Sequence, residues 1–104
     1  MGVLSRLLWT TALVACGANA PRPATHDDFH AIQRHEATLD QVRTAALEGS
    51  CPEPCAAAAE GCAAADAICA IAAEVTDRDA DLRCRAARER CERYRAASTR
   101  CGCP

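Results

Sequence analysis

The spacing of eight cysteines constrains the fold of this 104-residue chain more than any other feature. Cys55, Cys62 and Cys69 recur at intervals of seven residues, and an alanine stands three residues after each of them. Side chains at this interval share one face of an α-helix, as the a and d positions of a heptad do. The pattern predicts two helices that face each other along rows of cysteine and small residues, because a second row of this kind follows in Cys84, Ala87, Cys91, Tyr94, Ser98 and Cys101.

Helical geometry limits how these cysteines can pair. Residues seven apart on one helix are separated by ~10.5 Å, beyond the ~7 Å Cα limit of a disulfide. Cys62 therefore cannot join Cys69, and Cys84 cannot join Cys91, so the bonds must run between helices. An antiparallel hairpin that turns near residue 76 or 77 places opposite each other residues whose numbers sum to about 153. This register predicts the pairs Cys62–Cys91 and Cys69–Cys84.

The same register constrains the pairing of the four outer cysteines less strictly. Continuing outward, the nested solution is Cys55–Cys101 with Cys51–Cys103, although these two pairs could be exchanged. Cross-links are expected because only ten residues of the mature chain are large and apolar, whereas 25 residues of the whole chain are Ala. An exported protein in an oxidising compartment can form them.

Three helical segments can be drawn from their capping signals. Thr25 and Asp28 resemble a capping box at the start of a helix over about 26–48, and Gly49 can end it. Ser50 and Glu53 predict a second capping box, at the start of a helix over about 51–75. A third helix should start near Ala80, capped by Asp77 or Asp79, and reach about 101. The predicted fold is all-α: a small disulfide-stapled helical bundle, made of an antiparallel hairpin (about 51–75 and 80–101) plus an N-terminal helix (about 26–48).

The first helix contains no cysteine, so we expect it to dock by packing alone. The flank of the second helix that carries Ile68, Ile71 and Val75 is the expected partner. The charges favour packing of the third helix beside the first two. Residues 26–75 contain two Arg and nine acidic residues, a net of −7, whereas residues 76–104 contain eight Arg and five acidic residues, a net of +3. Surface pairs of this kind should bias the orientation more than they stabilise the fold.

The first 15 residues are typical of an export signal. Arg6 supplies positive charge, and the apolar stretch over 7–15 is too short to span a bilayer as a helix. The segment Leu13-Val14-Ala15-Cys16 resembles the lipobox of bacterial lipoproteins. An alternative cleavage after Ala20 would leave Pro21 as the first residue, which ordinary signal peptidase is expected to reject.

The lipobox resemblance implies a location. Cys16 would carry acyl chains that anchor the protein in a lipid bilayer, residues 1–15 would be removed, and residues 16–25 would form a short extended tether to a domain over 26–104. Gly17 is not the Asp that resembles an inner-membrane retention signal, so the outer membrane is favoured, with the domain periplasmic or surface-exposed. The chain as a whole resembles the uncharacterised cysteine-rich lipoproteins of GC-rich Gram-negative bacteria, which implies an envelope location and no activity.

We predict a non-catalytic structural or protein-interaction module with an envelope protein partner, no cofactor and no nucleic-acid partner. Two alternatives stay open. His26 and His30, four residues apart, could bind a metal or small ligand, with His35 as a further candidate, although exposed histidines at a helix start are the simpler interpretation. Cys101 and Cys103 could act in thiol–disulfide redox or assembly chemistry, although structural half-cystines are the simpler interpretation. The seven arginines between Arg83 and Arg100 favour a solvated, ion-paired face over a nucleic-acid site, and no nucleophile-elbow, phosphate-loop or paired-carboxylate signature occurs.

Overall fold

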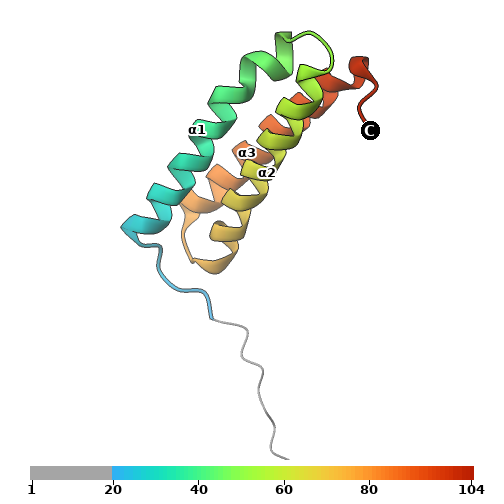
Figure 1. Ribbon diagram of the computed structural model, residues 1–104. Coiled ribbons are helices and arrows are strands. Elements are labelled where there is room, and N and C mark those ends of the chain that lie inside the picture. The colour runs from blue at the N-terminus through green and yellow to red at the C-terminus, as the bar shows by residue number, and fades with distance from the viewer. Residues whose placement is uncertain (1–19) are drawn as a thin grey trace, which may run out of the picture.

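The computed structural model describes residues 20–104, which form a bundle of three α-helices and one short 3₁₀ turn (Figure 1). Helix α1 spans His26–Glu48, α2 spans Glu53–Glu74, α3 spans Arg78–Ser98, and the 3₁₀ turn η1 spans Thr99–Cys101. Each helix runs antiparallel to the next along the chain, and α1 contacts both α2 and α3. This is the all-α, disulfide-stapled bundle that the sequence predicts. The signal segment, Cys16 and the first tether residues lie outside the described part of the chain.

Two of the expected helix caps are present. The Thr25 side chain accepts a hydrogen bond from the backbone N–H of Asp28, and the Asp28 carboxylate accepts one from the backbone N–H of Thr25, which completes a capping box. Asp77 accepts from the backbone N–H of Ala80 at 3.0 Å, so α3 begins at Arg78, two residues before the predicted start.

The predicted capping box at the start of α2 is wrong. Pro52 is the N-cap of α2, and no side chain caps this end. The Ser50 backbone carbonyl accepts from the backbone N–H of Glu53 at 2.9 Å, which closes a turn before the helix begins. The helix starts only after Pro52, which has no N–H to donate and occupies the position that Ser50 was expected to fill.

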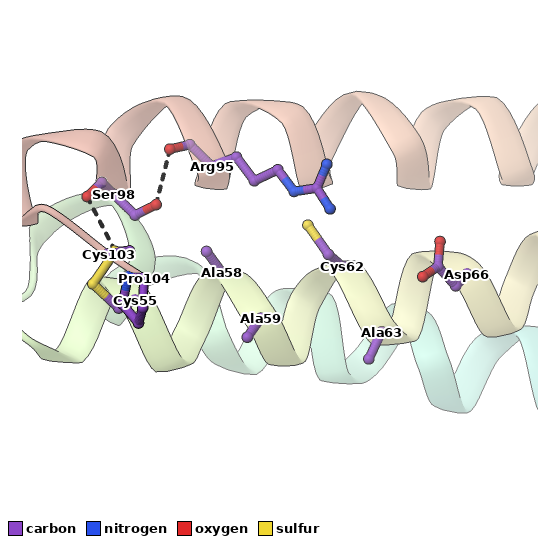
Figure 2. A pocket seen from close by; sticks show the side chains of 10 residues that line it. All are labelled: Cys55, Ala58, Ala59, Cys62, Ala63, Asp66, Arg95, Ser98, Cys103 and Pro104. Atoms are coloured by element: carbon purple, nitrogen blue, oxygen red, sulfur yellow. Dashed lines mark hydrogen bonds between the residues drawn. A yellow bond between two sulfur atoms is a disulfide. The ribbon is translucent and has the colours of Figure 1, made fainter.

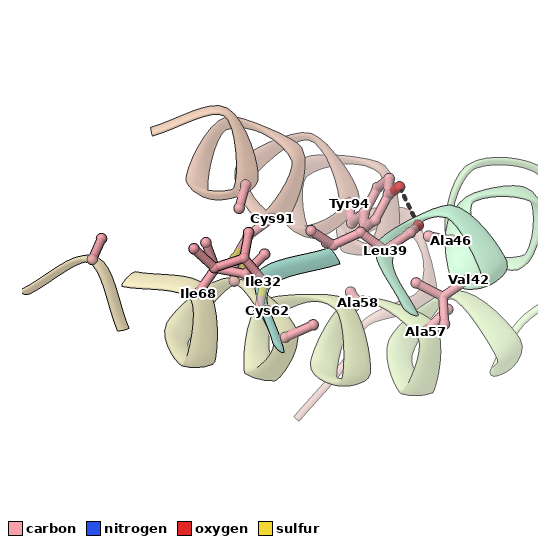
Figure 3. Packing of buried hydrophobic residues seen from close by; sticks show 14 of the residues in the cluster. Ile32, Leu39, Val42, Ala46, Ala57, Ala58, Cys62, Ile68, Cys91 and Tyr94 are labelled. Carbon is pink, nitrogen blue, oxygen red and sulfur yellow. Dashed lines mark hydrogen bonds between the residues drawn. A yellow bond between two sulfur atoms is a disulfide. The ribbon is translucent and has the colours of Figure 1, made fainter. Parts of the chain in front are cut away.

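The core is formed by one face of each helix, and α2 contributes mainly small side chains to it. Its buried alanines form one cluster with Ile68, which is fully buried, and with Cys62 and Cys91 of an inner disulfide (Figure 3). From α1, the buried residues are Ile32, Leu39, Val42 and Ala46. Leu82, one of the ten large apolar residues of the mature chain, is 47% exposed, because it lies on the face of α3 opposite the cysteine row.

Tyr94 of α3 joins all three helices at the centre of the bundle. Its ring is 2% exposed, and its hydroxyl donates a 2.8 Å hydrogen bond to the backbone carbonyl of Leu39 in α1 (Figure 3). The ring packs over Gly61 of α2, where a Cβ atom would lie only 2.8 Å from Cδ2 of Tyr94 and 3.3 Å from Cγ2 of Val42. Glycine at this position therefore allows both neighbouring helices to approach α2 closely.

Helix α1 is held without a disulfide, as its lack of cysteine predicts, and the charges of the two segments meet as expected. It packs on α2 as predicted, with Ile68 and Val75 buried, but α3 also holds it through polar contacts. Arg83 pairs with Glu36 at 2.9 Å, and Arg90 pairs with Asp40. The sequence showed the charge difference between the segments, but the positions of these pairs depend on the rotation of each helix, which only the packed bundle defines.

Among the described residues, one helix, α2, is long and apolar enough to cross a membrane by length and composition alone. Half of that apolar window is buried within the bundle. The apolar character of α2 follows from its place at the core, where it contacts both other helices.

Candidate functional site

Four disulfides connect the α2 side of the hairpin to the α3 side. Cys62 joins Cys91 and Cys69 joins Cys84, each with a Cα–Cα distance of 4.7 Å. These are the two inner pairs that the antiparallel register predicts. Facing alanines such as Ala58, Ala65 and Ala87 are buried and leave the helix backbones close enough for these short bridges.

The outer pairs take the exchanged arrangement, which the sequence left open, and not the nested one. Cys51 joins Cys101, and Cys55 joins Cys103, with Cα–Cα distances of 5.4 and 5.5 Å. The reason is the end of α3, where Gly102 takes a left-handed conformation with φ of +61° and turns the chain back. The Cys103 sulfur returns to within 3.3 Å of the Ser98 carbonyl oxygen and faces Cys55.

A shallow groove runs between α2 and α3 beside these bridges, with a volume of about 340 Å³ (Figure 2). Asp66 and Arg95 give it one charge of each sign, and its floor is otherwise built from small side chains. The Ser98 hydroxyl that lines it donates to the Arg95 carbonyl at 2.8 Å, so this hydroxyl is engaged in the end of the helix. The remaining lining residues are Cys55, Ala58, Ala59, Cys62, Ala63, Cys103 and Pro104. Such a surface is suited to receive a small apolar side chain of a partner.

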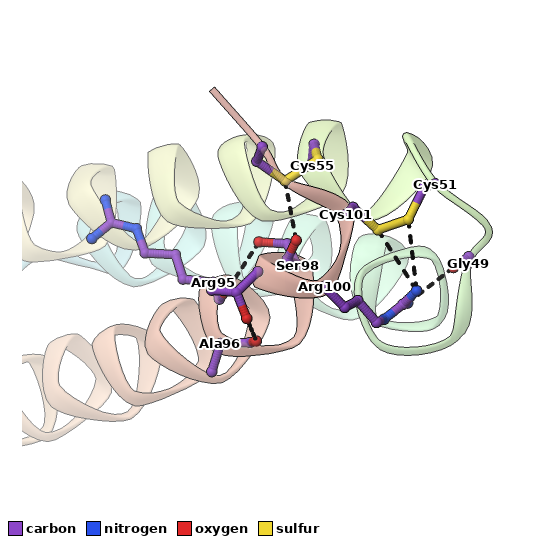
Figure 4. The surroundings of a disulfide bond; sticks show 10 residues. Gly49, Cys51, Cys55, Arg95, Ala96, Ser98, Arg100 and Cys101 are labelled. Atoms are coloured by element: carbon purple, nitrogen blue, oxygen red, sulfur yellow. Dashed lines mark hydrogen bonds between the residues drawn. A yellow bond between two sulfur atoms is a disulfide. The ribbon is translucent and has the colours of Figure 1, made fainter.

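The end of the bundle that carries the outer disulfides also carries Arg100. Its Nη1 lies 3.6 Å from the sulfur of Cys101 and 3.9 Å from the sulfur of Cys51 (Figure 4). Its Nη2 donates to the Gly49 carbonyl at 3.0 Å, which holds the guanidinium over the disulfide. From the sequence, Arg100 was expected only on a charged, solvated face. Its position next to Cys101 in the chain was the available signal.

The opposite end of the bundle holds the described part of the expected tether. Arg22 forms a backbone bridge with the chain between α2 and α3: its N–H donates to the Glu74 carbonyl at 3.3 Å, and its carbonyl accepts from the N–H of Thr76 at 2.8 Å. Its guanidinium also makes two hydrogen bonds to the Asp28 carboxylate, at 2.6 and 3.0 Å. The last part of the tether is therefore attached to the bundle rather than extended away from it.

The Arg22 contact has an electrostatic consequence. The side-chain hydrogen bond from Arg22, followed by the backbone hydrogen bond from Thr25, holds the pKa of Asp28 well below its usual range. The same hydrogen bond raises the pKa of Arg22. The carboxylate thus stays charged while it caps α1 and binds the tether.

The structure brings two of the three histidines together. The rings of His26 and His30 lie side by side on α1, with centroids 5.3 Å apart. Within residues 20–104, no group of three His, Cys, Asp or Glu side chains could hold a metal ion. His35 lies farther along α1 and is not brought into such a group.

Arginines on α3 divide into two sets. Arg83 and Arg90 face α1 and form the ion pairs described above, and Arg83 also lies over the Phe29 ring at 5.6 Å from its centroid. In the described part of the chain, the exposed Arg85, Arg88 and Arg93 form no ion pair within 4 Å. The expected ion-paired face is therefore present only on the side of α3 that meets α1.

Cys101 and Cys103 are each bonded to the other side of the hairpin and not to each other. A redox pair made of these two adjacent cysteines, one of the alternatives from the sequence, is therefore not formed in this structure. No protein-family model, no curated protein and no solved structure matches this chain.

Proposed function

We propose that this protein is a lipid-anchored envelope lipoprotein whose bundle serves as a non-catalytic structural or protein-interaction module. The observation that carries the proposal is the complete pairing of the eight cysteines from Cys51 to Cys103 with one another. No cysteine among the described residues remains free to form a disulfide with Cys16. A ninth cysteine that directly follows an apolar export segment is then best explained as the lipid attachment site of the lipobox.

The contacts of Arg22 indicate how the anchored bundle would be oriented relative to the membrane. Between Cys16 and Arg22 stand residues 17–21, and an extended chain spans at most ~3.3–3.6 Å per residue. An anchored Cys16 would thus keep the turn between α2 and α3 within ~20 Å of the bilayer surface. The end with Arg100 and the outer disulfides lies at the other end of the helices and would face away from the membrane (Figure 1).

The groove between α2 and α3 supports an interaction role rather than catalysis. It presents alanine side chains, two rigid disulfides and one charge of each sign, and its hydroxyl is bonded to the backbone. Disulfides fix the shape of this surface before a partner binds, which lowers the entropy lost on binding. A small, rigid surface of this kind suits a protein partner in the envelope.

The anchor is tested by expressing the full chain in a Gram-negative host and measuring the mass of the mature N-terminal peptide. We expect a peptide that begins at Cys16 and carries acyl chains, and the Cys16→Ser variant should lose the acyl mass and leave the membrane fraction. Ala18→Ser, which leaves the lipobox intact, is the matched control and should stay acylated. A wild-type protein that begins at Pro21 would overturn the proposal.

The interaction role is tested by cross-linking in intact cells. A photoreactive residue at position 59 or 63, on the groove floor, should capture an envelope protein, whereas one at position 86, on the outer face of α3, serves as the control. Equal capture from both positions, or none from the groove, would contradict a partner surface in the groove.

A further inference from the structure

The disulfide between Cys51 and Cys101 differs from the other three in its exposure. Cys51 is exposed and precedes α2, and Cys101 is half-buried in η1. The other six half-cystines are buried or half-buried. Cys51 is thus the one exposed residue among the eight half-cystines, and it is the natural point of attack for an external thiol.

It also differs in its charge environment. Arg100 contacts both sulfurs, at 3.6 and 3.9 Å, while its second terminal nitrogen is bound to the Gly49 carbonyl (Figure 4). Within residues 20–104, no carboxylate lies within 4 Å of Arg100 to neutralise it. A neighbouring guanidinium stabilises a thiolate and therefore lowers the pKa of a cysteine released beside it. None of the other three bridges has an arginine hydrogen-bonded to a sulfur among the described contacts.

We propose that Cys51–Cys101 is a thiol–disulfide exchange site, which opens and closes while the bundle stays folded. Its chemical partner is a dithiol, whose two thiols open the bridge and whose disulfide form closes it again by the reverse steps. The proposal stands independently of the lipid anchor, because it uses only contacts at this end of the bundle.

The exchange proceeds in two balanced steps. A thiolate of the dithiol attacks the exposed sulfur of Cys51 and forms a mixed disulfide, while the electron pair of the old S–S bond goes to Cys101, which leaves as a thiolate beside Arg100. The second thiol of the partner, as its thiolate, then attacks the mixed disulfide at the partner's sulfur and releases Cys51 as a thiolate, which takes a proton from water. The dithiol is oxidised to a disulfide, and the protein disulfide is reduced by the same two electrons.

The neighbouring bridge lets this exchange occur without unfolding. Cys55–Cys103 joins the same two ends of the hairpin, four residues along from Cys51 and two residues along from Cys101. Opening the outer bond would therefore leave α2 and α3 connected by three disulfides. Only the loop before α2 and the η1 turn would gain freedom, and neither contributes a fully buried large side chain to the core.

The test treats the oxidised full-length protein with increasing dithiothreitol at pH 7, followed by alkylation and peptide mass mapping. We expect Cys51 and Cys101 to be alkylated first and together, with native helicity by circular dichroism at that stage. Arg100→Gln should slow this first opening by about three- to tenfold, because the leaving thiol loses its stabilising charge. Arg93→Gln changes an exposed arginine of α3 that has no sulfur contact; it is the matched control and should open at the wild-type rate.

A second variant separates exchange from unfolding. The double substitution Cys51→Ala with Cys101→Ala should keep its helicity and should resist alkylation at the reductant concentration that opens the wild-type bridge. First opening at a different bridge, an unchanged rate in Arg100→Gln, or loss of helicity in the double variant would each overturn the proposal.

Discussion

Helix α1 and the α2–α3 hairpin form one bundle but are held by different kinds of interaction. Four disulfides connect the two sides of the hairpin, whereas α1 carries no cysteine and is held by burial, ion pairs and one buried hydrogen bond. A disulfide limits the unfolded chain even when the helices separate, but noncovalent contacts disappear together with the docked state. The hairpin can therefore act as a rigid frame from which α1 separates first.

The largest effect should come from removing the covalent frame. Each bond contributes ~2–4 kcal/mol alone, although nested bonds share part of the entropy that they remove. We expect the fully reduced and alkylated protein to lose cooperative unfolding, because an alanine-rich core cannot offset chain entropy by itself. Circular dichroism during thermal unfolding measures this. Native helicity and a sharp thermal unfolding transition in the reduced protein would show that the hairpin is stable without its disulfides.

The next largest effect is expected at the contact between the two regions. Tyr94→Ala removes a buried ring that contacts all three helices and should lower the free energy of unfolding by ~3–5 kcal/mol. Amide hydrogen exchange should accelerate in α1 more than in the hairpin. Tyr94→Phe, the matched control, keeps the ring and loses the two hydrogen bonds of the hydroxyl, which donates to the Leu39 carbonyl and accepts from Nη2 of Arg90, and should lose ~0.5–1.5 kcal/mol for each. Equal acceleration in both regions would contradict the separate opening of α1.

A smaller effect should follow from the ion pairs between α3 and α1. Arg90→Gln removes the pair with Asp40, whose side chain is 71% exposed, so screening limits this part of the loss to ~0.2–1 kcal/mol. The substitution also removes the hydrogen bond from Nη2 of Arg90 to the Tyr94 hydroxyl, and that part of the loss should not depend on salt. The loss should shrink as salt is added, since ions screen an exposed pair. Arg88→Gln, on the outer face of α3, is the control. Urea unfolding at low and high salt measures the difference, and an Arg90→Gln loss that is independent of salt would argue for packing instead of charge.

The smallest effect should appear at the start of α1, where Asp28 binds Arg22. The folded pKa of Asp28 lies below its unfolded value of about 3.9, so its stabilisation is present above that pH and is lost as the pH falls through the folded pKa. Asp28→Asn should lose this contribution at pH 7 and should show a weaker acid dependence. Asp27→Asn, one residue earlier, is the control. Thermal unfolding between pH 2 and pH 7 checks it, and an unchanged acid dependence in Asp28→Asn would contradict the assignment.

Features that depend on local periodicity could be predicted from the sequence. Helical rise and the seven-residue spacing were sufficient to select Cys62–Cys91 and Cys69–Cys84, because both cysteines of each pair lie inside regular helices. The Thr25 capping box and the Asp77 cap could also be predicted, because each involves residues only three apart in the sequence. Helical geometry repeats regularly along the chain. The pairing of residues that is set near the connection between α2 and α3 therefore holds for several helical turns away from it.

Features at the chain ends and in the loops were decided only by the tertiary structure. The reversal at Gly102 exchanged the outer disulfides, and the docking of Arg22 on the α2–α3 connection placed the end of the tether. Arg100 lies beside the Cys51–Cys101 bridge because the tertiary structure brings the end of α3 next to the loop before α2. The sequence alone determined three helices and the paired inner cysteines, because those follow from repeating local geometry. It did not determine the loop paths or helix rotations, because these depend on contacts between residues far apart in the chain.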